Sequence, residues 1–194
     1  MTPEQSKIQM HFYHIFKELG LDLTDPNLTD SPIRMSKMFI EFCKNYGETP
    51  ENIIKTFPNE KNYDEIILMD NIPFVSICSH HFLPFPGLAW FLYIPNKTLV
   101  GASKPARTLK FFAKKPQLQE NLGTEVVDEF IKEVKPLGVM LVMRAIHGCM
   151  QCRGVETGDN AGMITSITRG TFRENPETRS EGLDLIKLSV MLRR

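Results

Sequence analysis

The chain has 194 residues and a formal net charge of zero, with 23 Lys and Arg against 23 Asp and Glu. Hydrophobic residues make up 42% and charged residues 24%, which is typical of a folded protein with one main domain. The neutral balance gives no overall positive field for a polyanion, and no run of about 18 uncharged apolar residues occurs, so we expect neither a nucleic-acid partner nor a membrane span.

The first 62 residues are expected to form a helical arm. Apolar residues recur at helical spacing over residues 5–19, and Gly20 ends that pattern. Ser31-Pro32 is a typical helix start, with Ser31 as the N-cap, and the second helix is predicted to end near Gly47. Residues 49–63 are polar and irregular, and we expect one short helix and a loop there.

Residues 63–194 are expected to form the main domain. Strands are predicted at residues 66–69, 74–77, 88–94, 98–100, 139–146 and 163–172. The turn at residues 95–97 predicts that the third and fourth strands form a hairpin. Helices are predicted at residues 104–113, 117–134 and 178–192. This order indicates an α+β fold with an antiparallel sheet and helices on one face.

The candidate chemistry lies in two short segments that hold three of the four cysteines and three of the five histidines. They are Cys78-Ser79-His80-His81 and residues 147–153, His-Gly-Cys-Met-Gln-Cys-Arg. Without a secretory signal we expect a cytoplasmic protein with reduced thiols.

Thiolates and imidazoles are the ligands that Zn²⁺ prefers. Cys78, His81 and Cys149 would leave one position open for a water, as in a catalytic site. Adding Cys152 would make a closed Cys3His structural site. The third alternative is that these thiols are simply buried and bind no metal.

Two further features favour the catalytic alternative. His80 and His147 lie beside the ligands without being needed as ligands, and imidazoles exchange protons near neutral pH. Cationic residues, which suit a phosphorylated substrate, occur in the same region of the sequence, two of them between the ligand segments and one at the end of the second segment: Lys104, Arg107 and Arg153. Glu120 has the chemistry to accept hydrogen bonds from guanine, although a Glu at a helix start is also expected from the helix dipole.

The same residues occur in the order found in GTP cyclohydrolase I, and the chain resembles that family from about Leu19 to Leu188. The resemblance rests on these motifs: Ser31-Pro32-x-Arg34-x-x-Lys37-Met38, Cys78-x-His80-His81, Tyr93-Ile94-Pro95-Asn96-Lys97, Gly101-x-Ser103-Lys104-x-x-Arg107, Pro116-Gln117-x-Gln119-Glu120 and His147-x-Cys149-Met150-x-x-Arg153-Gly154. It implies the tunnelling fold for residues 63–194, with a four-stranded antiparallel sheet and two helices on one face. It also implies a barrel-forming homodecamer with active sites between subunits.

The activity implied by the resemblance is the conversion of GTP and water into 7,8-dihydroneopterin triphosphate and formate. Cys78, His81 and Cys149 would bind zinc, which activates the water, and His80 and His147 would handle protons. Ser103 would lie near the ribose, and Gln119 and Glu120 would hold the guanine. The triphosphate would be held by the cations Lys104, Arg107 and Arg153, with Arg34 and Lys37 from a neighbouring chain.

The chain departs from the family pattern at several positions. Ser79 stands where the family usually has Glu, Asn121 replaces an expected Arg, Cys152 precedes Arg153, Pro105 follows Lys104, and the segment 156–162 looks divergent. Two alternatives therefore stay open. One is a related cyclohydrolase acting on another purine nucleotide such as dGTP, and the other is a non-catalytic oligomer with a structural Cys3His zinc site.

Overall fold

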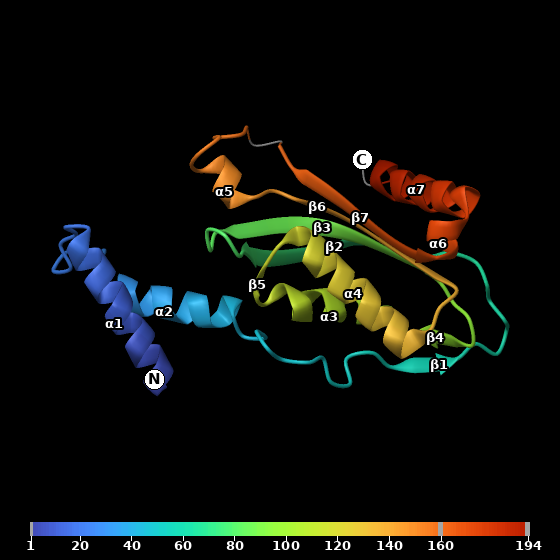
Figure 1. The fold of residues 1–194 in the computed structure, drawn as a ribbon, viewed down its shortest axis with the longest axis horizontal. Helices are drawn as coiled ribbons and strands as arrows, with labels where there is room; N and C mark the ends of the chain where they lie inside the picture. The colour runs from blue at the N-terminus through green and yellow to red at the C-terminus, as the bar shows by residue number, and fades with distance from the viewer. Residues whose placement is uncertain (1, 159–160, 193–194) are drawn as a thin grey trace.

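The computed structural model describes residues 2–158 and 161–192, and a five-stranded sheet lies at its centre (Figure 1). The strands, including two that form a separate small sheet, are β1 (Thr56–Pro58), β2 (Ile67–Cys78), β3 (Pro84–Ile94), β4 (Thr98–Val100), β5 (Pro116–Gln117), β6 (Gly138–Ala145) and β7 (Met163–Gly170). The helices are α1 (Pro3–Glu18), α2 (Ser31–Phe42), α3 (Lys104–Ala113), α4 (Gln119–Val134), α5 (Gly148–Gln151), α6 (Thr171–Glu174) and α7 (Pro176–Met191). The architecture is α+β, as the sequence predicts.

The strand order in the main sheet is β5-β2-β3-β6-β7. The strands β2, β3, β6 and β7 are antiparallel, and the two-residue β5 pairs parallel with the end of β2. Antiparallel neighbours need only short connections, and the loop from β2 to β3 spans residues 79–83. The start of β3 pairs with the end of β6, so segments about 60 residues apart in sequence meet at one end of the sheet.

The main core lies between the sheet and the helices α3 and α4. Phe130 of α4 packs edge-on against Phe91 and Tyr93 of β3, with ring centroids 4.7 and 5.3 Å apart. Gly123 allows α4 to lie close to the sheet, because a Cβ there would clash with the side chains of Met143 and Ile167. This close approach places the first residue of α4, Gln119, directly over β6 and β7.

The sequence predicts helices on one face only, but the opposite face of the sheet is partly covered by α6 and α7. Phe172 of α6 is fully buried against Leu92 and Met140. On α7 the one fully buried residue in the described chain is Gly182, and large apolar side chains of this helix stay exposed: Leu183, Leu188, Val190 and Met191. No helix among the described residues is long and apolar enough to span a membrane.

The helices α1 and α2 pack on each other and extend from one end of the sheet (Figure 1). The end of α2 is tied to the end of α3, where Glu41 forms an ion pair with Lys114 at 2.8 Å. The side chain of Asn45 also donates a hydrogen bond to the Phe111 carbonyl at 2.9 Å. The second helix ends at Phe42 and not near Gly47, and Ser31 is its first helical residue, with Asp30 at the N-cap.

Several predicted elements differ from the observed ones. The two strands predicted at residues 66–69 and 74–77 are parts of one strand, β2, which begins at Ile67 and has a bulge between Met69 and Ile72, where Asn71 has φ +54°. The predicted hairpin is wrong because β4 pairs with β1 and not with β3. The predicted short helix within residues 49–63 is also absent from that described segment, which contributes β1 instead. Helix α4 begins two residues later than predicted, because Gln117 belongs to β5.

Candidate metal centre and active site

The loop between β2 and β3 carries the first cluster of candidate ligands. The Cys78 amide donates to the Leu83 carbonyl at 2.9 Å, and the Phe82 amide donates back to the Cys78 carbonyl at 2.8 Å. We call residues 78–83, closed by these two bonds, the metal loop. Cys78 is buried at the end of β2, whereas His80 and His81 are exposed.

The second cluster follows β6. The Ile146 amide donates to the Pro86 carbonyl at 2.9 Å, which extends the pairing of β6 with β3 as far as the metal loop. His147 comes next, and Cys149 lies in the single turn of α5. The sheet register therefore places this segment beside Cys78 and His81.

Cys78, His81 and Cys149 form a group whose ligand atoms all lie within 4.8 Å of one another. Two thiols and one imidazole suit Zn²⁺, whose bonds to sulfur and nitrogen are about 2.0–2.3 Å long. A small movement of these three side chains toward one another would bring all three ligand atoms within bonding distance of one ion. Burial raises the pKa of the Cys149 thiol, and the adjacent Cys78 raises it further, while Arg153 acts in the opposite direction. A metal at this position would therefore displace thiol protons.

Cys152 is not part of this group. Its exposed thiol donates to the Gly148 carbonyl at 2.9 Å, within the turn of α5. The described residues thus assemble three ligands from the two segments, which is the donor number of a site with an open position.

His147 lies between an aromatic ring and a buried amide. Its imidazole stacks on Phe85, with centroids 4.7 Å apart and planes 6° from parallel. Its Nε2 lies 3.0 Å from Oε1 of Gln119, whose side chain is almost fully buried. Burial lowers the pKa of His147, and the negative charge of Glu120 opposes part of that shift.

The surroundings of Gln119 determine which nitrogen of His147 carries the proton. Nε2 of Gln119 lies 3.0 Å from the Thr165 hydroxyl and 3.3 Å from the carbonyls of both Met143 and Met163. Carbonyl oxygens only accept, so the amide NH₂ must face them and Oε1 must face His147. Since Oε1 also only accepts, His147 donates from Nε2, and the lone pair of its neutral ring is at Nδ1.

The chain as a whole is similar to known proteins of one family. The family model described as GTP cyclohydrolase I matches residues 8–187. A protein of Pseudomonas aeruginosa named GTP cyclohydrolase 1 2 is 37% identical over 180 residues, covering 93% of this chain and 99% of that protein. Proteins named GTP cyclohydrolase 1 from Pelotomaculum thermopropionicum and a Hydrogenobaculum species are 38% and 41% identical, covering 95% and 87% of this chain and 97% and 90% of their own. The chain belongs to the GTP cyclohydrolase I family.

The other residues of the GTP cyclohydrolase I motifs lie on several different elements of the fold. Glu120 follows Gln119 in the first turn of α4, and its negative charge acts to raise the pKa of His147. The positive charge of Arg153 acts to lower the pKa of the Cys149 thiol. Arg34 and Lys37 are exposed on α2, where Arg34 pairs with Asp30 at 3.4 Å.

Ser103, Lys104 and Arg107 lie at the start of α3, next to β4, and Pro105 fits there as one of the first helical residues. The end of that helix adjoins β5, which pairs with Cys78. A ten-residue helix is roughly 15 Å long, so Ser103 and Lys104 lie about that far along the helix axis from the end that adjoins β5.

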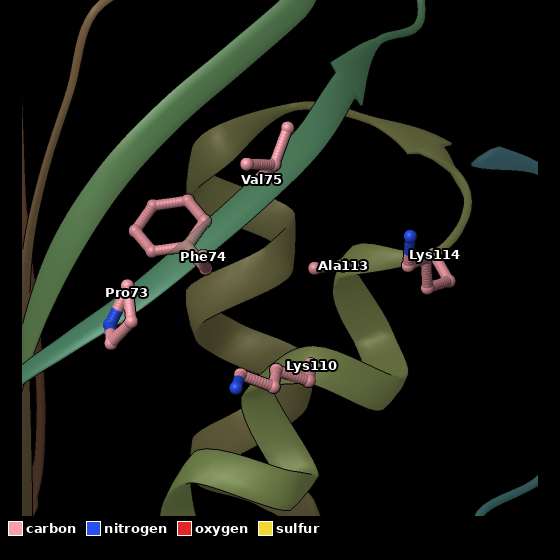
Figure 2. Close-up of a pocket in the computed structure, with 6 residues that line it drawn as sticks. All are labelled: Pro73, Phe74, Val75, Lys110, Ala113 and Lys114. Atoms are coloured by element: carbon pink, nitrogen blue, oxygen red, sulfur yellow. The ribbon is translucent and has the colours of Figure 1, made fainter. Parts of the chain in front are cut away.

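A hollow of about 320 Å³ lies between β2 and α3 (Figure 2), and its lining residues are Pro73, Phe74, Val75, Lys110, Ala113 and Lys114. Phe74 and Val75 provide an apolar side, whereas Lys110 lies on α3 and Lys114 caps its C-terminal end (Figure 2). None of the motif residues lines this hollow, so it is separate from the candidate active site.

Sequence reasoning missed Phe85 and Thr165, because strand register alone brings them to His147 and Gln119. It also missed Phe82, although this residue directly follows the paired histidines. Ser79 is one of the positions that depart from the family pattern. Its backbone amide donates a hydrogen bond to the Gln117 carbonyl at 3.2 Å. Residues 159–160 of the divergent segment lie outside the described residues.

Proposed function

We propose that this protein is a zinc-dependent GTP cyclohydrolase I, which converts GTP and water into 7,8-dihydroneopterin triphosphate and formate. Membership of the family and near full-length relatives named for this activity support the proposal. The observation that carries it is the Cys78, His81 and Cys149 group lying beside a hydrogen-bonded His147. Zinc held by these three residues would supply Lewis-acid activation of the water that attacks the guanine.

His147 is proposed as a proton acceptor and donor during ring opening. Its lowered pKa keeps the ring neutral near pH 7, and the bond to Gln119 leaves the basic lone pair at Nδ1. Stacking on Phe85 restricts rotation of the ring. His80, exposed and next to the ligand His81, is proposed as the second proton-transfer group.

Glu120 is proposed to bind the guanine edge, because an exposed carboxylate at the start of α4 lies near His147 and accepts two hydrogen bonds side by side. The family resemblance implies the same guanine-binding role for Gln119. Both ends of its amide are hydrogen-bonded within the protein, so we propose that it positions His147 instead.

The triphosphate is proposed to bind Arg153 from one chain and Lys104 and Arg107 from a neighbouring copy, with Ser103 of that copy near the ribose. The position of Ser103 and Lys104 at the end of α3 away from β5 supports this division. Arg34 and Lys37, exposed on α2, are proposed to add positive charge to the same anion.

The protein is proposed to adopt the tunnelling fold as a homodecamer, with residues 1–62 as the arm and residues 63–194 as the catalytic domain. Among the described strands β7 pairs with β6 alone, and its Ile164 is 65% exposed, so this edge is available to a second copy. The exposed apolar side chains of α7 support the same conclusion. A cytoplasmic location is part of the same proposal.

The test is to incubate the purified chain with GTP and to measure formate release and pterin fluorescence after oxidation. Both products are expected, lost with a zinc chelator and restored by added zinc. Formate without pterin would contradict the proposed role of Ser103 at the ribose. Neither product from a zinc-loaded oligomer would contradict the activity, and dGTP would then test the alternative substrate.

A further inference from the structure

Phe82, the residue after the ligand His81, has an unusual backbone conformation. Its φ is +53°, in the left-handed region, which is uncommon for an aromatic residue and is normally occupied by Gly, Asn or Asp. This conformation closes the metal loop, since the Phe82 amide bonds the Cys78 carbonyl at 2.8 Å. Strained backbone of this kind persists only where the surroundings hold it in place.

A ring from the arm lies against Phe82. Phe39 of α2 stacks on Phe82, with centroids 5.9 Å apart and planes 14° from parallel. Phe82 is partly exposed, at 42% of its surface, and Phe39 is an aromatic ring that stacks on it. This stack is thus a direct side-chain contact between α2 and the loop that carries His80 and His81.

Phe39 is itself held on two sides. Phe12 of α1 lies behind it, with ring centroids 5.0 Å apart. The C-terminal end of α2 is tied to α3 by the ion pair of Glu41 with Lys114, and Asn45 beyond the helix bonds the Phe111 carbonyl. Phe39 is therefore presented to the metal loop from a fixed helix.

We propose that Phe39 is a positioning residue for the metal centre, acting through Phe82 to hold His81 where it can share an ion with Cys78 and Cys149. The arm then contributes to zinc affinity. Without the stack, the loop would leave its strained conformation for part of the time, and zinc would have to restore it on binding. Apparent affinity falls in proportion to the fraction of molecules in the competent conformation.

This inference rests on the metal site proposed above, so the experiment first measures zinc binding by the unaltered full-length chain. Zinc affinity is determined by competition with a chromophoric chelator, and Co²⁺ absorption reports the ligand geometry. The variants are Phe39→Leu, which removes the ring, Phe39→Tyr, which keeps it, and Phe82→Asn, which suits the left-handed backbone but cannot stack. Phe12→Leu is the matched control, because it removes a ring that contacts Phe39 and keeps the Phe39 ring itself, while the Glu41–Lys114 ion pair and the Asn45 hydrogen bond still hold the C-terminal end of α2.

Phe39→Leu is expected to weaken zinc binding about 2- to 12-fold, the range that corresponds to a typical aromatic pair. Phe39→Tyr and Phe12→Leu should remain within about twofold of the unaltered chain by the same measure. Phe82→Asn should weaken binding although it relieves the backbone, with a broadened or shifted Co²⁺ spectrum.

The possible failures give different results in these measurements. If the unaltered chain binds no zinc, the metal site and the proposed function are both wrong. If it binds zinc and Phe39→Leu binds equally well, or Phe82→Asn binds more tightly, only the positioning role of Phe39 is wrong. An equal loss in Phe12→Leu and Phe39→Leu would also overturn it, since the arm would then act through general stability.

Discussion

Replacing Gln119 with Leu tests whether this residue positions His147 or binds the substrate. Leu is similar in size and fills the buried space, but it offers no acceptor to Nε2 of His147. It also leaves the carbonyls of Met143 and Met163 without the amide that now lies 3.3 Å from each. The imidazole then loses the bond that sets both its tautomer and its orientation.

The expected magnitude follows from these contacts. An unsatisfied buried polar group costs about 1–3 kcal/mol, and a domain of this size loses about 2–4 °C of Tm per kcal/mol, so a fall of roughly 2–12 °C is expected. Proton transfer by a positioned side chain contributes about 10²–10⁴ in rate, and partial loss of that positioning should lower kcat about 10- to 100-fold. The KM for GTP should change little, because neither end of the Gln119 amide is available to the base.

The assay is steady-state formate release, with bound zinc and Tm measured on the same samples. Thr165→Val is the matched control, since it removes one acceptor at the far end of the Gln119 amide and leaves the bond to His147. It should lower kcat less than Gln119→Leu. A large rise in KM with kcat unchanged would refute the reasoning and return Gln119 to the guanine site.

Three other outcomes are expected. Cys152→Ser should keep zinc and activity, because its thiol bonds Gly148 and not the metal group, and loss of zinc would instead support a closed Cys3His site. Zinc affinity should rise with pH between about 6 and 8, by about tenfold per pH unit for each thiol proton displaced. The reason is that the raised pKa of Cys149 keeps that thiol protonated until the metal binds. A zinc affinity that does not change with pH in chelator competition would contradict this. Glu120→Ala should raise the KM for GTP and reduce discrimination against ATP, and unchanged discrimination would remove Glu120 from the guanine site.

Local sequence signals predicted the elements with strong periodicity. The apolar spacing of residues 117–134 predicts α4 to within two residues at its start, since a helix depends on neighbours three and four positions apart. The strands β6 and β7 were predicted to within two residues at each end. Strand pairing was less predictable. A turn at residues 95–97 suggests a hairpin, yet β4 pairs with β1, because pairing depends on partners distant in sequence.

For the candidate site, the sequence alone determined which residue types were available and that they fall in two short segments. Cys78 and His81, three residues apart, belong to a tight loop that local spacing already indicates. The family resemblance already favoured Cys149 over Cys152, and the tertiary structure gives the physical reason, because the pairing of β3 with β6 brings the start of α5 to the metal loop. The bond of His147 to Gln119 and the stack of Phe39 on Phe82 depend in the same way on contacts between distant segments. Such contacts arise from strand register and helix docking, and no spacing within one segment encodes them.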